Sequence, residues 1–382
     1  MERPRIVIVG GGPAGLSTAL YLLERCPFLK DDLTILEKAS YPRDKVCAGG
    51  LIRRALDHLR VLGISLDIPH VRIDRASLVF PDGEAFTFES PWQGVVVSRR
   101  DFDALLAREV KKRGVRILEG VRVRNLRTFA GGVAIDTDRG EFKTEIVIGA
   151  DGTGSVARRC LFANRKGVAR TMVKEVPLAE ESDEFRRSLW RFDFTSVPKR
   201  LQGYAWLFPV VLGGKPHLNV GLYDRNRRRK APYPLAETLE QVLAQEGLGG
   251  PARLRSFPIW EYHWRNRLSL PHVLLVGDAA GADPLMGEGI SLAFDYGRTA
   301  SREIAQGLSR SDFSFRSYGR RVWREFGWRL SLLSVATACL YGKRARFWFS
   351  LARSRSLRER AASWYLGVRP SDHAGMTALP HF

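Results

Sequence analysis

Apolar runs and helical spacings alternate at the start of the chain and predict a strand–helix–strand unit. Residues 5–9, RIVIV, form a β-branched run typical of a buried parallel strand. Four glycines follow between residues 10 and 15, and residues 16–26 then place apolar side chains at helical spacing. A second strand over residues 33–38 completes a βαβ unit.

The rest of the chain divides into helical and strand-rich stretches. Helical spacing predicts helices over residues 51–62, 101–114 and 235–246, and a helical remainder from residue 298. Strands are expected over residues 70–97 with a hairpin turn at Pro81-Asp82-Gly83, over 115–150 with turns at 131–132 and 139–140, over much of 166–265, and over 272–276.

These elements predict an interleaved domain organisation. One α/β core is expected from residues 1–65, 95–165 and 266–305, and a second, sheet-based region from residues 66–94 and 166–265. Residues 306–382 are expected to form a helical, basic C-terminal region.

The charge balance is strongly positive. A net charge of +20, from 61 Lys and Arg against 41 Asp and Glu, implies an anionic partner. Residues 310–382 hold 14 Lys or Arg against 4 Asp or Glu, with aromatic residues interleaved. Such a segment suits peripheral binding to a membrane, and it also fits a solvated helical face packed on the core. An acidic electron-donor protein is a further candidate partner, whereas no nucleic acid is expected because no recognition motif accompanies the charge.

The cysteines give no sign of a metal site or a disulfide framework. Cys26, Cys47, Cys160 and Cys339 form no CxxC pair and no Cys/His ligand set. We therefore expect reduced thiols in a cytoplasmic protein, or in one held on the inner face of the membrane. The first apolar run ends at once in glycines, unlike a signal peptide, and the apolar run 330–341 is too short to span a bilayer.

The glycine-rich segment fits the GxGxxG pattern of a dinucleotide site. Gly10 permits a tight turn, Gly12 lets a pyrophosphate approach the backbone, and Gly15 lets the helix pack closely on the strand. Pro13 and Ala14 of this motif are candidate cofactor-binding residues, and Glu37 ends the second strand where a carboxylate can accept from ribose hydroxyls. An acid there favours FAD or NAD over NADP at this site.

Two later segments repeat the pattern of a strand running into glycines. The first is GADGTGSVARR, residues 149–159, with Asp151 and Gly152 after a buried strand. The second is GDAAGADPLMGEGI, residues 277–290. Its candidate residues are Gly277, Asp278, Pro284, Gly287, Gly289 and Ile290. Each alone also fits an ordinary glycine turn.

Taken together, these three motifs resemble the flavoprotein family of p-hydroxybenzoate hydroxylase, the flavin-dependent halogenases and the geranylgeranyl reductases. The resemblance spans about residues 5–305. It implies a mixed α/β (α+β) fold with a Rossmann-type FAD-binding core, an antiparallel-sheet substrate domain and a helical C-terminal region. It also implies FAD as the cofactor. The cofactor contacts implied by the resemblance extend to Lys38, Arg43, Cys47, Ala48, Val123 and to Arg99 in SRRDFDALL.

The segment GYAWLFP, residues 203–209, resembles the YxWxFP element of the geranylgeranyl reductases. In that family the element lines a cavity for an isoprenoid chain, which makes Tyr204 and Trp206 candidate active-site residues. Alternate strand positions point to one side, so Tyr204, Trp206 and Phe208 predict an aromatic wall. The same pattern fits an aromatic core face. The family often has a proline three residues before the tyrosine, where this chain has Leu201.

The segment KVCAGGL, residues 45–51, resembles the Lys-x-Cys-x-Gly-Gly segment of the same reductases, which in that family borders the flavin ring. Gly49 and Gly50 allow the backbone to lie against the ring. The thiol of Cys47 is either a weak proton donor or a small packing group.

Other branches of the family fit less well. The halogenases need a catalytic lysine, and no lysine occurs between Lys45 and Lys111. The iron–sulfur quinone oxidoreductases need clustered cysteines.

The resemblance therefore implies an FAD-dependent reductase that saturates C=C bonds of an isoprenoid, geranylgeranyl-type chain by hydride transfer in lipid biosynthesis. Arg43 and Lys45 are candidate ligands for an anionic lipid head group. The alternatives are an FAD-dependent monooxygenase that hydroxylates or epoxidises an apolar substrate, and an electron-relay flavoprotein. The external electron donor, NAD(P)H or ferredoxin, is left open.

Overall fold

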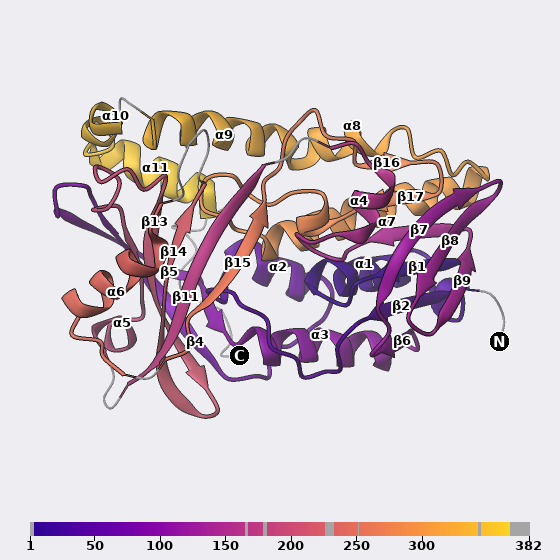
Figure 1. The fold of residues 1–382 in the computed structure, drawn as a ribbon, viewed down its shortest axis with the longest axis horizontal. Coiled ribbons are helices and arrows are strands. Elements are labelled where there is room, and N and C mark those ends of the chain that lie inside the picture. Colours follow the sequence, from indigo (N-terminus) through magenta and orange to yellow (C-terminus); the bar gives the residue numbers. More distant parts are fainter. Residues whose placement is uncertain are drawn as a thin grey trace.

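The structure is a computed structural model that describes residues 4–164, 167–178, 182–225, 233–250, 252–342 and 345–366. Figure 1 shows an elongated molecule with a layered core at one end, a large twisted sheet at the other, and the C-terminal helices running along one long side.

A six-stranded sheet forms the centre of the core, in the order β16-β17-β10-β1-β2-β6. Its strands are β1 (Ile6–Val9), β2 (Leu33–Glu37), β6 (Arg116–Glu119), β10 (Ile146–Gly149), β16 (Ser269–Leu270) and β17 (Val273–Leu275). All neighbours are parallel except β16 and β17. Strands β1, β2 and β10 are buried throughout, as expected for short β-branched runs covered on both faces.

Helices pack on this sheet and on each other. The principal ones are α1 (Pro13–Arg25), α3 (Arg99–Lys112) and α7 (Ile290–Arg310), and the shorter elements are α4 (Val156–Leu161), η1 (Pro27–Lys30) and η2 (Gly277–Ala279). Helix α1 packs against both α3 and α7. The βαβ unit expected at the start of the chain is therefore confirmed.

A three-stranded antiparallel sheet lies in the chain between the core strands β6 and β10. It contains β7 (Val123–Phe129), β8 (Gly132–Thr137) and β9 (Gly140–Thr144). The turns expected at residues 131–132 and 139–140 are both present.

The large sheet has eight strands in the order β15-β11-β14-β13-β12-β4-β5-β3. Its strands are β3 (Gly50–Ile52), β4 (His70–Val79), β5 (Ala85–Val97), β11 (Val168–Pro177), β12 (Leu189–Asp193), β13 (Gly203–Leu212), β14 (Lys215–Asp224) and β15 (Arg255–Trp260). The hairpin at residues 81–83 is confirmed. Neighbours are antiparallel except β12 and β4, which run parallel. Helices α5 (Asp183–Arg186) and α6 (Leu235–Gln245) lie beside this sheet.

The helix expected over residues 51–62 starts later than its apolar spacing indicates. Leu51 and Ile52 belong to β3 and pair with β5, and helix α2 covers Arg53–Val61. Leu51 is fully buried in the sheet. Tertiary pairing therefore decides the conformation of these two residues over local helical spacing.

The C-terminal part is helical. Its elements are α8 (Tyr318–Val322), a π-helical turn η3 (Trp323–Gly327), α9 (Trp328–Leu340), α10 (Ala345–Leu351) and α11 (Arg355–Leu366). Phe349 of α10 packs on Phe80 and Phe194 of the large-sheet region. None of the helices in the described part of the chain is both long and apolar enough to span a bilayer.

Candidate active site

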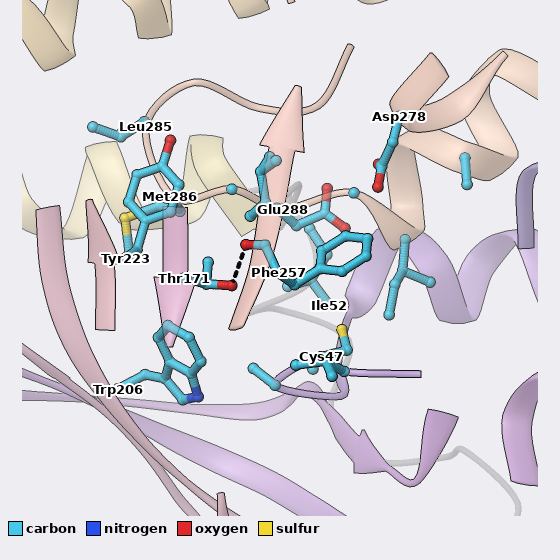
Figure 2. A pocket seen from close by; sticks show the side chains of 18 of the residues that line it. Cys47, Ile52, Thr171, Trp206, Tyr223, Phe257, Asp278, Leu285, Met286 and Glu288 are labelled. Carbon is cyan, nitrogen blue, oxygen red and sulfur yellow. Dashed lines mark hydrogen bonds between the residues drawn. The ribbon is translucent and has the colours of Figure 1, made fainter. Parts of the chain in front are cut away.

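One cavity of about 1160 Å³ extends from the core to the C-terminal helices. Its wall includes Glu37 at the end of β2, Tyr204 and Trp206 of β13, and Trp348 and Tyr365 of the C-terminal helices. Figure 2 shows side chains of several chain segments facing one space, among them those of Cys47, Trp206, Phe257 and Glu288. Segments far apart in sequence thus share one site.

The glycine-rich turn between β1 and α1 has the geometry that its sequence predicts. Gly10 has a φ of +106°, and a Cβ there would lie 2.4 Å from the carbonyl oxygen of Ala150. A Cβ on Gly15 would lie 2.0 Å from the carbonyl oxygen of Gly10, so the helix packs directly on the turn. A Cβ on Gly12 would meet only Arg43 Nη2, at 3.6 Å. Gly12 therefore leaves open space in front of the helix start.

Glu37 lies beside this turn with its side chain buried. Its Oε2 accepts from the Gly11 N–H at 2.8 Å, and its Oε1 accepts from the Ala39 N–H at 3.0 Å. Arg43 Nε lies 3.7 Å from Glu37 Oε1, and Arg43 Nη2 donates to the Gly11 carbonyl at 3.2 Å. Arg43 is thus placed at the glycine-rich turn.

Asp103 holds two arginines in the wall, and the sequence motifs did not single it out. Its fully buried carboxylate accepts from Arg99 Nε at 2.8 Å and from Arg99 Nη2 at 2.9 Å. Arg43 Nη2 lies 3.0 Å from Asp103 Oδ2. The Phe-Asp pair in SRRDFDALL was the available signal, because Arg99 and Asp103 stand four residues apart on one helix face.

Asp151 and Gly152 follow β10 and line the cavity. Asp151 Oδ2 accepts from the N–H groups of Val156 at 2.6 Å and Ala157 at 3.2 Å, which caps α4. Its Oδ1 is buried without a hydrogen-bond partner among the described residues. Burial raises the pKa of this carboxyl group. A buried acceptor in the wall suits a polar ligand atom.

The third motif forms η2 and the loop before α7. Asp278, Gly287, Gly289 and Ile290 line the cavity, whereas Gly277 packs against Ala14 beneath it. A Cβ on Gly289 would lie 2.9 Å from Asp278 Oδ1, so this glycine gives the carboxylate room.

Four tyrosine hydroxyls hold the loop 283–286, and we call this set the tyrosine clamp. It comprises Tyr223 donating to the Pro284 carbonyl at 3.2 Å, Tyr341 to Leu285 at 3.4 Å, Tyr204 to Met286 at 2.6 Å, and Tyr365 to Asp283 Oδ2 at 2.6 Å. Pro284 does not line the cavity, but it belongs to this clamped loop. The clamp ties the loop to the large sheet and to the C-terminal helices together.

The aromatic wall lies where the alternation predicts it. Tyr204, Trp206 and Phe208 of β13 all line the cavity, together with Trp190 and Phe192 of β12. Tyr204 lies near Trp206 with ring centroids 6.2 Å apart, and Phe192 makes an edge contact with Phe208 at 5.3 Å. This face is apolar and aromatic over the length of the strand.

The loop that carries Cys47 joins the core to this wall. Asn219 Nδ2 donates to the Cys47 carbonyl at 3.0 Å, and Trp206 Nε1 donates to Asn219 Oδ1 at 2.8 Å. Cys47 and Gly50 line the cavity, but Gly49 does not. Gly49 has a φ of +78°, and its Cβ would lie 2.2 Å from the Val97 carbonyl oxygen. A glycine is thus needed at position 49 because the backbone packs closely on β5, and not because a ligand in the cavity approaches it.

Lys45 lies in the same wall, half-buried, with its ammonium group over the Phe257 ring. Burial, with the nearby charge of Arg99, lowers the pKa of Lys45 from its ordinary value of 10.5 to about 8, while Asp278 and Cys47 act in the opposite direction. Burial also raises the pKa of Glu288, another wall residue. The cavity wall therefore holds a lysine whose pKa is lowered to about 8.

Most of the sequence-predicted site residues meet in this one cavity. Those not named above that line it are Pro13, Ala14, Lys38, Ala48 and Val123. Gly15, Gly49, Gly277 and Pro284 lie behind its surface. Sequence reasoning missed the wall contributed by the C-terminal helices, including Leu340, Tyr341, Phe349 and Tyr365. Their aromatic content was the only signal.

The residues at the core end fit an FAD molecule on three structural grounds. Open space lies in front of Gly12 at the start of α1, where backbone N–H groups lack partners within the helix. Glu37 ends β2 beside that turn. The buried Asp151 Oδ1 has no hydrogen-bond partner among the described residues and can accept a hydrogen bond from a ligand.

Comparison with known proteins agrees with these observations. A family model described as an FAD binding domain matches residues 3–320. The digeranylgeranylglycerophospholipid reductase of Methanocaldococcus jannaschii is 30% identical over 352 residues, which cover 84% of this chain and 82% of that protein.

Solved structures share the fold. A geranylgeranyl bacteriochlorophyll reductase-like protein from Thermoplasma acidophilum superimposes with a TM-score of 0.76 at 21% identity, covering 89% of this chain and 88% of that one. The flavin-dependent halogenase CmlS superimposes with a TM-score of 0.68 at 22% identity, covering 96% of this chain and 70% of that one. At such identities, these likenesses concern the fold alone.

Proposed function

The chain belongs to the FAD binding domain family as an FAD-dependent oxidoreductase of the geranylgeranyl reductase type, and we propose that it saturates C=C bonds of a lipid-borne isoprenoid chain. The observation that carries the proposal is one continuous cavity. It joins a dinucleotide-type turn at one end to a long aromatic and aliphatic wall at the other.

Residues at the core end would hold the cofactor. Gly12 and the start of α1 face the space for a pyrophosphate, Glu37 is placed for ribose hydroxyls, and Asp151 and Asp278 offer carboxylates further along the wall. Arg99 and Arg43 add positive charge, and Asp103 holds their guanidinium groups in position. Bound FAD, once reduced, supplies the electron pair as a hydride.

The aromatic wall would bind and orient the hydrocarbon. An isolated alkene has no carbonyl group to polarise, so its reduction depends on positioning in a dry cavity. Tyr204, Trp206 and Phe208 present flat apolar surfaces, and the hydroxyl of Tyr204 is turned to the Met286 carbonyl rather than left unpaired. A chain lying along β13 is thereby kept from water.

Saturation also needs a proton. For each double bond, the π bond breaks and two C–H bonds form, one from the hydride and one from the proton. Lys45 and Cys47 are the two cavity-wall groups that we propose for holding that proton. The electron pair comes ultimately from an external reductant, a reduced nicotinamide or a reduced ferredoxin.

Product analysis tests this function. The FAD-loaded protein, reduced chemically without oxygen, is incubated with a geranylgeranyl phospholipid, and the lipid is then examined by mass spectrometry. We expect mass gains in whole hydrogen pairs. A lipid that stays unchanged, while the same sample of reduced protein remains folded, would refute the proposal.

A second candidate is an FAD-dependent monooxygenase acting on an apolar substrate. The fold, which the chain shares with a flavin-dependent halogenase, is compatible with it, since one fold hosts several reactions. Such an enzyme consumes oxygen and gives an oxygenated product. Product formation under strictly anaerobic conditions therefore separates the two candidates.

A further inference from the structure

The C-terminal helices present an apolar face to solvent. Trp328, Leu332 and Val335 stand at intervals of four and three residues on α9, so they form one stripe along that helix. Val335 is 62% exposed and Leu332 53%. Four neighbouring helical side chains on α10 and α11 that are also exposed are Phe347, Trp348, Leu351 and Trp364. We call this whole set, together with Leu357, the C-terminal face.

The C-terminal face is continuous with the cavity. Trp348, Leu351, Leu357 and Trp364 are exposed to solvent and also line the cavity wall. The same four side chains thus belong both to the cavity wall and to the C-terminal face. The cavity therefore borders the C-terminal face at α10 and α11.

Exposed arginines accompany this face, whereas Arg353, between α10 and α11, is paired with Asp82 and Glu84. Arg346 of α10, and Arg355 and Arg360 of α11, are exposed. Arg360 falls on the same helix face as Leu357 and Trp364, because these positions are three and four residues apart. Within the described helices α9–α11, Glu359 is the sole acidic residue, and it pairs with Arg355. An apolar helical surface with basic residues around it matches an anionic bilayer.

We propose that the C-terminal face docks on an anionic lipid bilayer and that the hydrocarbon chain passes from the bilayer into the cavity between α10 and α11. The apolar side chains insert below the head groups, and the arginines contact lipid phosphates. The access route rests on the proposed function for the identity of the substrate, whereas docking does not depend on it.

Vesicle binding tests the docking. The full-length, FAD-loaded protein is floated with vesicles of equal parts phosphatidylcholine and phosphatidylglycerol, and with vesicles of phosphatidylcholine alone. We expect binding to the anionic vesicles that weakens with salt. Leu332→Gln with Val335→Gln should weaken it at least tenfold, and Arg360→Gln about fivefold, the effect of one basic residue near an anionic surface. None of these three residues lines the cavity.

A matched control comes from the core end of the molecule. Phe28 is 65% exposed and Val61 69%, and neither lines the cavity. The double variant Phe28→Gln with Val61→Gln also removes two exposed apolar side chains, as Leu332→Gln with Val335→Gln does, but neither belongs to the C-terminal face. We expect its vesicle binding to equal that of the unaltered protein.

Several results would overturn the docking proposal. One is an equal loss of vesicle binding in the control variant and in the variants of the C-terminal face. Another is that the unaltered protein does not bind anionic vesicles. Self-association that Leu332→Gln with Val335→Gln abolishes, without vesicle binding, identifies a second copy as the occupant. Binding that emerges only after removal of residues 367–382 identifies the chain's own end as the occupant.

A pair of activity measurements tests the access route. The Leu332→Gln, Val335→Gln variant should reduce isoprenoid embedded in vesicles at least tenfold more slowly, yet reduce the same isoprenoid dispersed in detergent at the unaltered rate. If the variant is as fast as the unaltered protein both with isoprenoid in vesicles and with isoprenoid in detergent, access from the bilayer is excluded. If neither protein reduces isoprenoid from any source, the proposed function fails, and flotation still decides the docking.

Discussion

At the residue scale, the chemistry depends on a few polar groups inside an otherwise apolar cavity. Asp103 is the clearest case, since its fully buried carboxylate pairs with Arg99 and lies 3.0 Å from Arg43. Removing one member of a buried ionic group leaves the others uncompensated, which costs more than the group itself contributes.

Asp103→Asn should therefore weaken both the fold and cofactor retention. We expect a loss of about 2–3 kcal/mol in the free energy of unfolding, because hydrogen bonds to charged groups are lost. Denaturant unfolding and FAD titration measure the two effects. Asp101→Asn, on the first turn of the same helix α3, is the control and should change neither. Unaltered FAD affinity in Asp103→Asn would contradict the role given to the two arginines.

The lowered pKa of Lys45 leads us to expect a fall in activity at alkaline pH. Burial disfavours its charged form, so Lys45 carries its proton below about pH 8 and loses it above. If this proton is used, the rate of isoprenoid reduction falls about tenfold per pH unit well above that pKa. A pH–rate profile measures it. Lys45→Met should be slow throughout and lack the inflection, whereas Lys215→Met, on the exposed end of β14, should keep it. A flat profile through pH 10 in the unaltered protein rules out Lys45 as the source.

Cys47 gives the competing source of the proton. Cys47→Ser keeps a small donor and Cys47→Ala removes it, while both leave the backbone contact of the Cys47 carbonyl with Asn219. Proton donation by the thiol predicts a stepwise loss of rate, about 10²-fold or more in Cys47→Ala. A packing role predicts near-normal rates in both. Lipid-dependent oxidation of the reduced flavin measures the outcome.

At the element scale, the tyrosine clamp connects three parts of the chain at one loop. Tyr365 of α11 donates to the Asp283 carboxylate. Tyr341, which directly follows α9, donates to the Leu285 carbonyl. These contacts hold the C-terminal helices against the loop that leads into α7. The clamp therefore couples the wall of the cavity to the position of Asp278 and Gly289.

Tyr365→Phe should loosen α10 and α11. It leaves the buried Asp283 carboxylate with only the N–H groups of Leu285 and Met286, a cost of about 1–3 kcal/mol. Hydrogen–deuterium exchange should quicken over residues 345–366. Tyr318→Phe is the control, since the Tyr318 hydroxyl donates to the Leu275 carbonyl in the core. Faster exchange of residues 345–366 in both variants would show that the effect is not specific to the clamp.

The sequence reveals elements whose signals are local. The βαβ unit, the hairpin at 81–83 and the one-sided aromatic row of β13 follow from spacing within a few residues. Strand β3 was mistaken for helix because its pairing with β5 is distant in sequence. The tyrosine clamp and the wall of α9–α11 were missed for the same reason. No local pattern indicates that Tyr365 meets Asp283 across the fold.

At the scale of the whole molecule, the arrangement separates two tasks along one cavity. The core end carries the polar groups suited to FAD, and the sheet and C-terminal helices carry the apolar wall. Figure 1 shows the C-terminal helices running from the core toward the large sheet. The interleaved division into a cofactor part, a substrate part and a C-terminal part remains a proposal, and this cavity supports it.

The most direct test of the central claim is a single-turnover measurement without oxygen. The FAD-loaded protein is reduced and mixed with geranylgeranyl phospholipid, or with the fully saturated lipid of the same length and head group, and the flavin absorbance is followed. The account predicts flavin oxidation with the unsaturated lipid and none with the saturated one. Oxidation at the same rate with both lipids, or with neither, would contradict it.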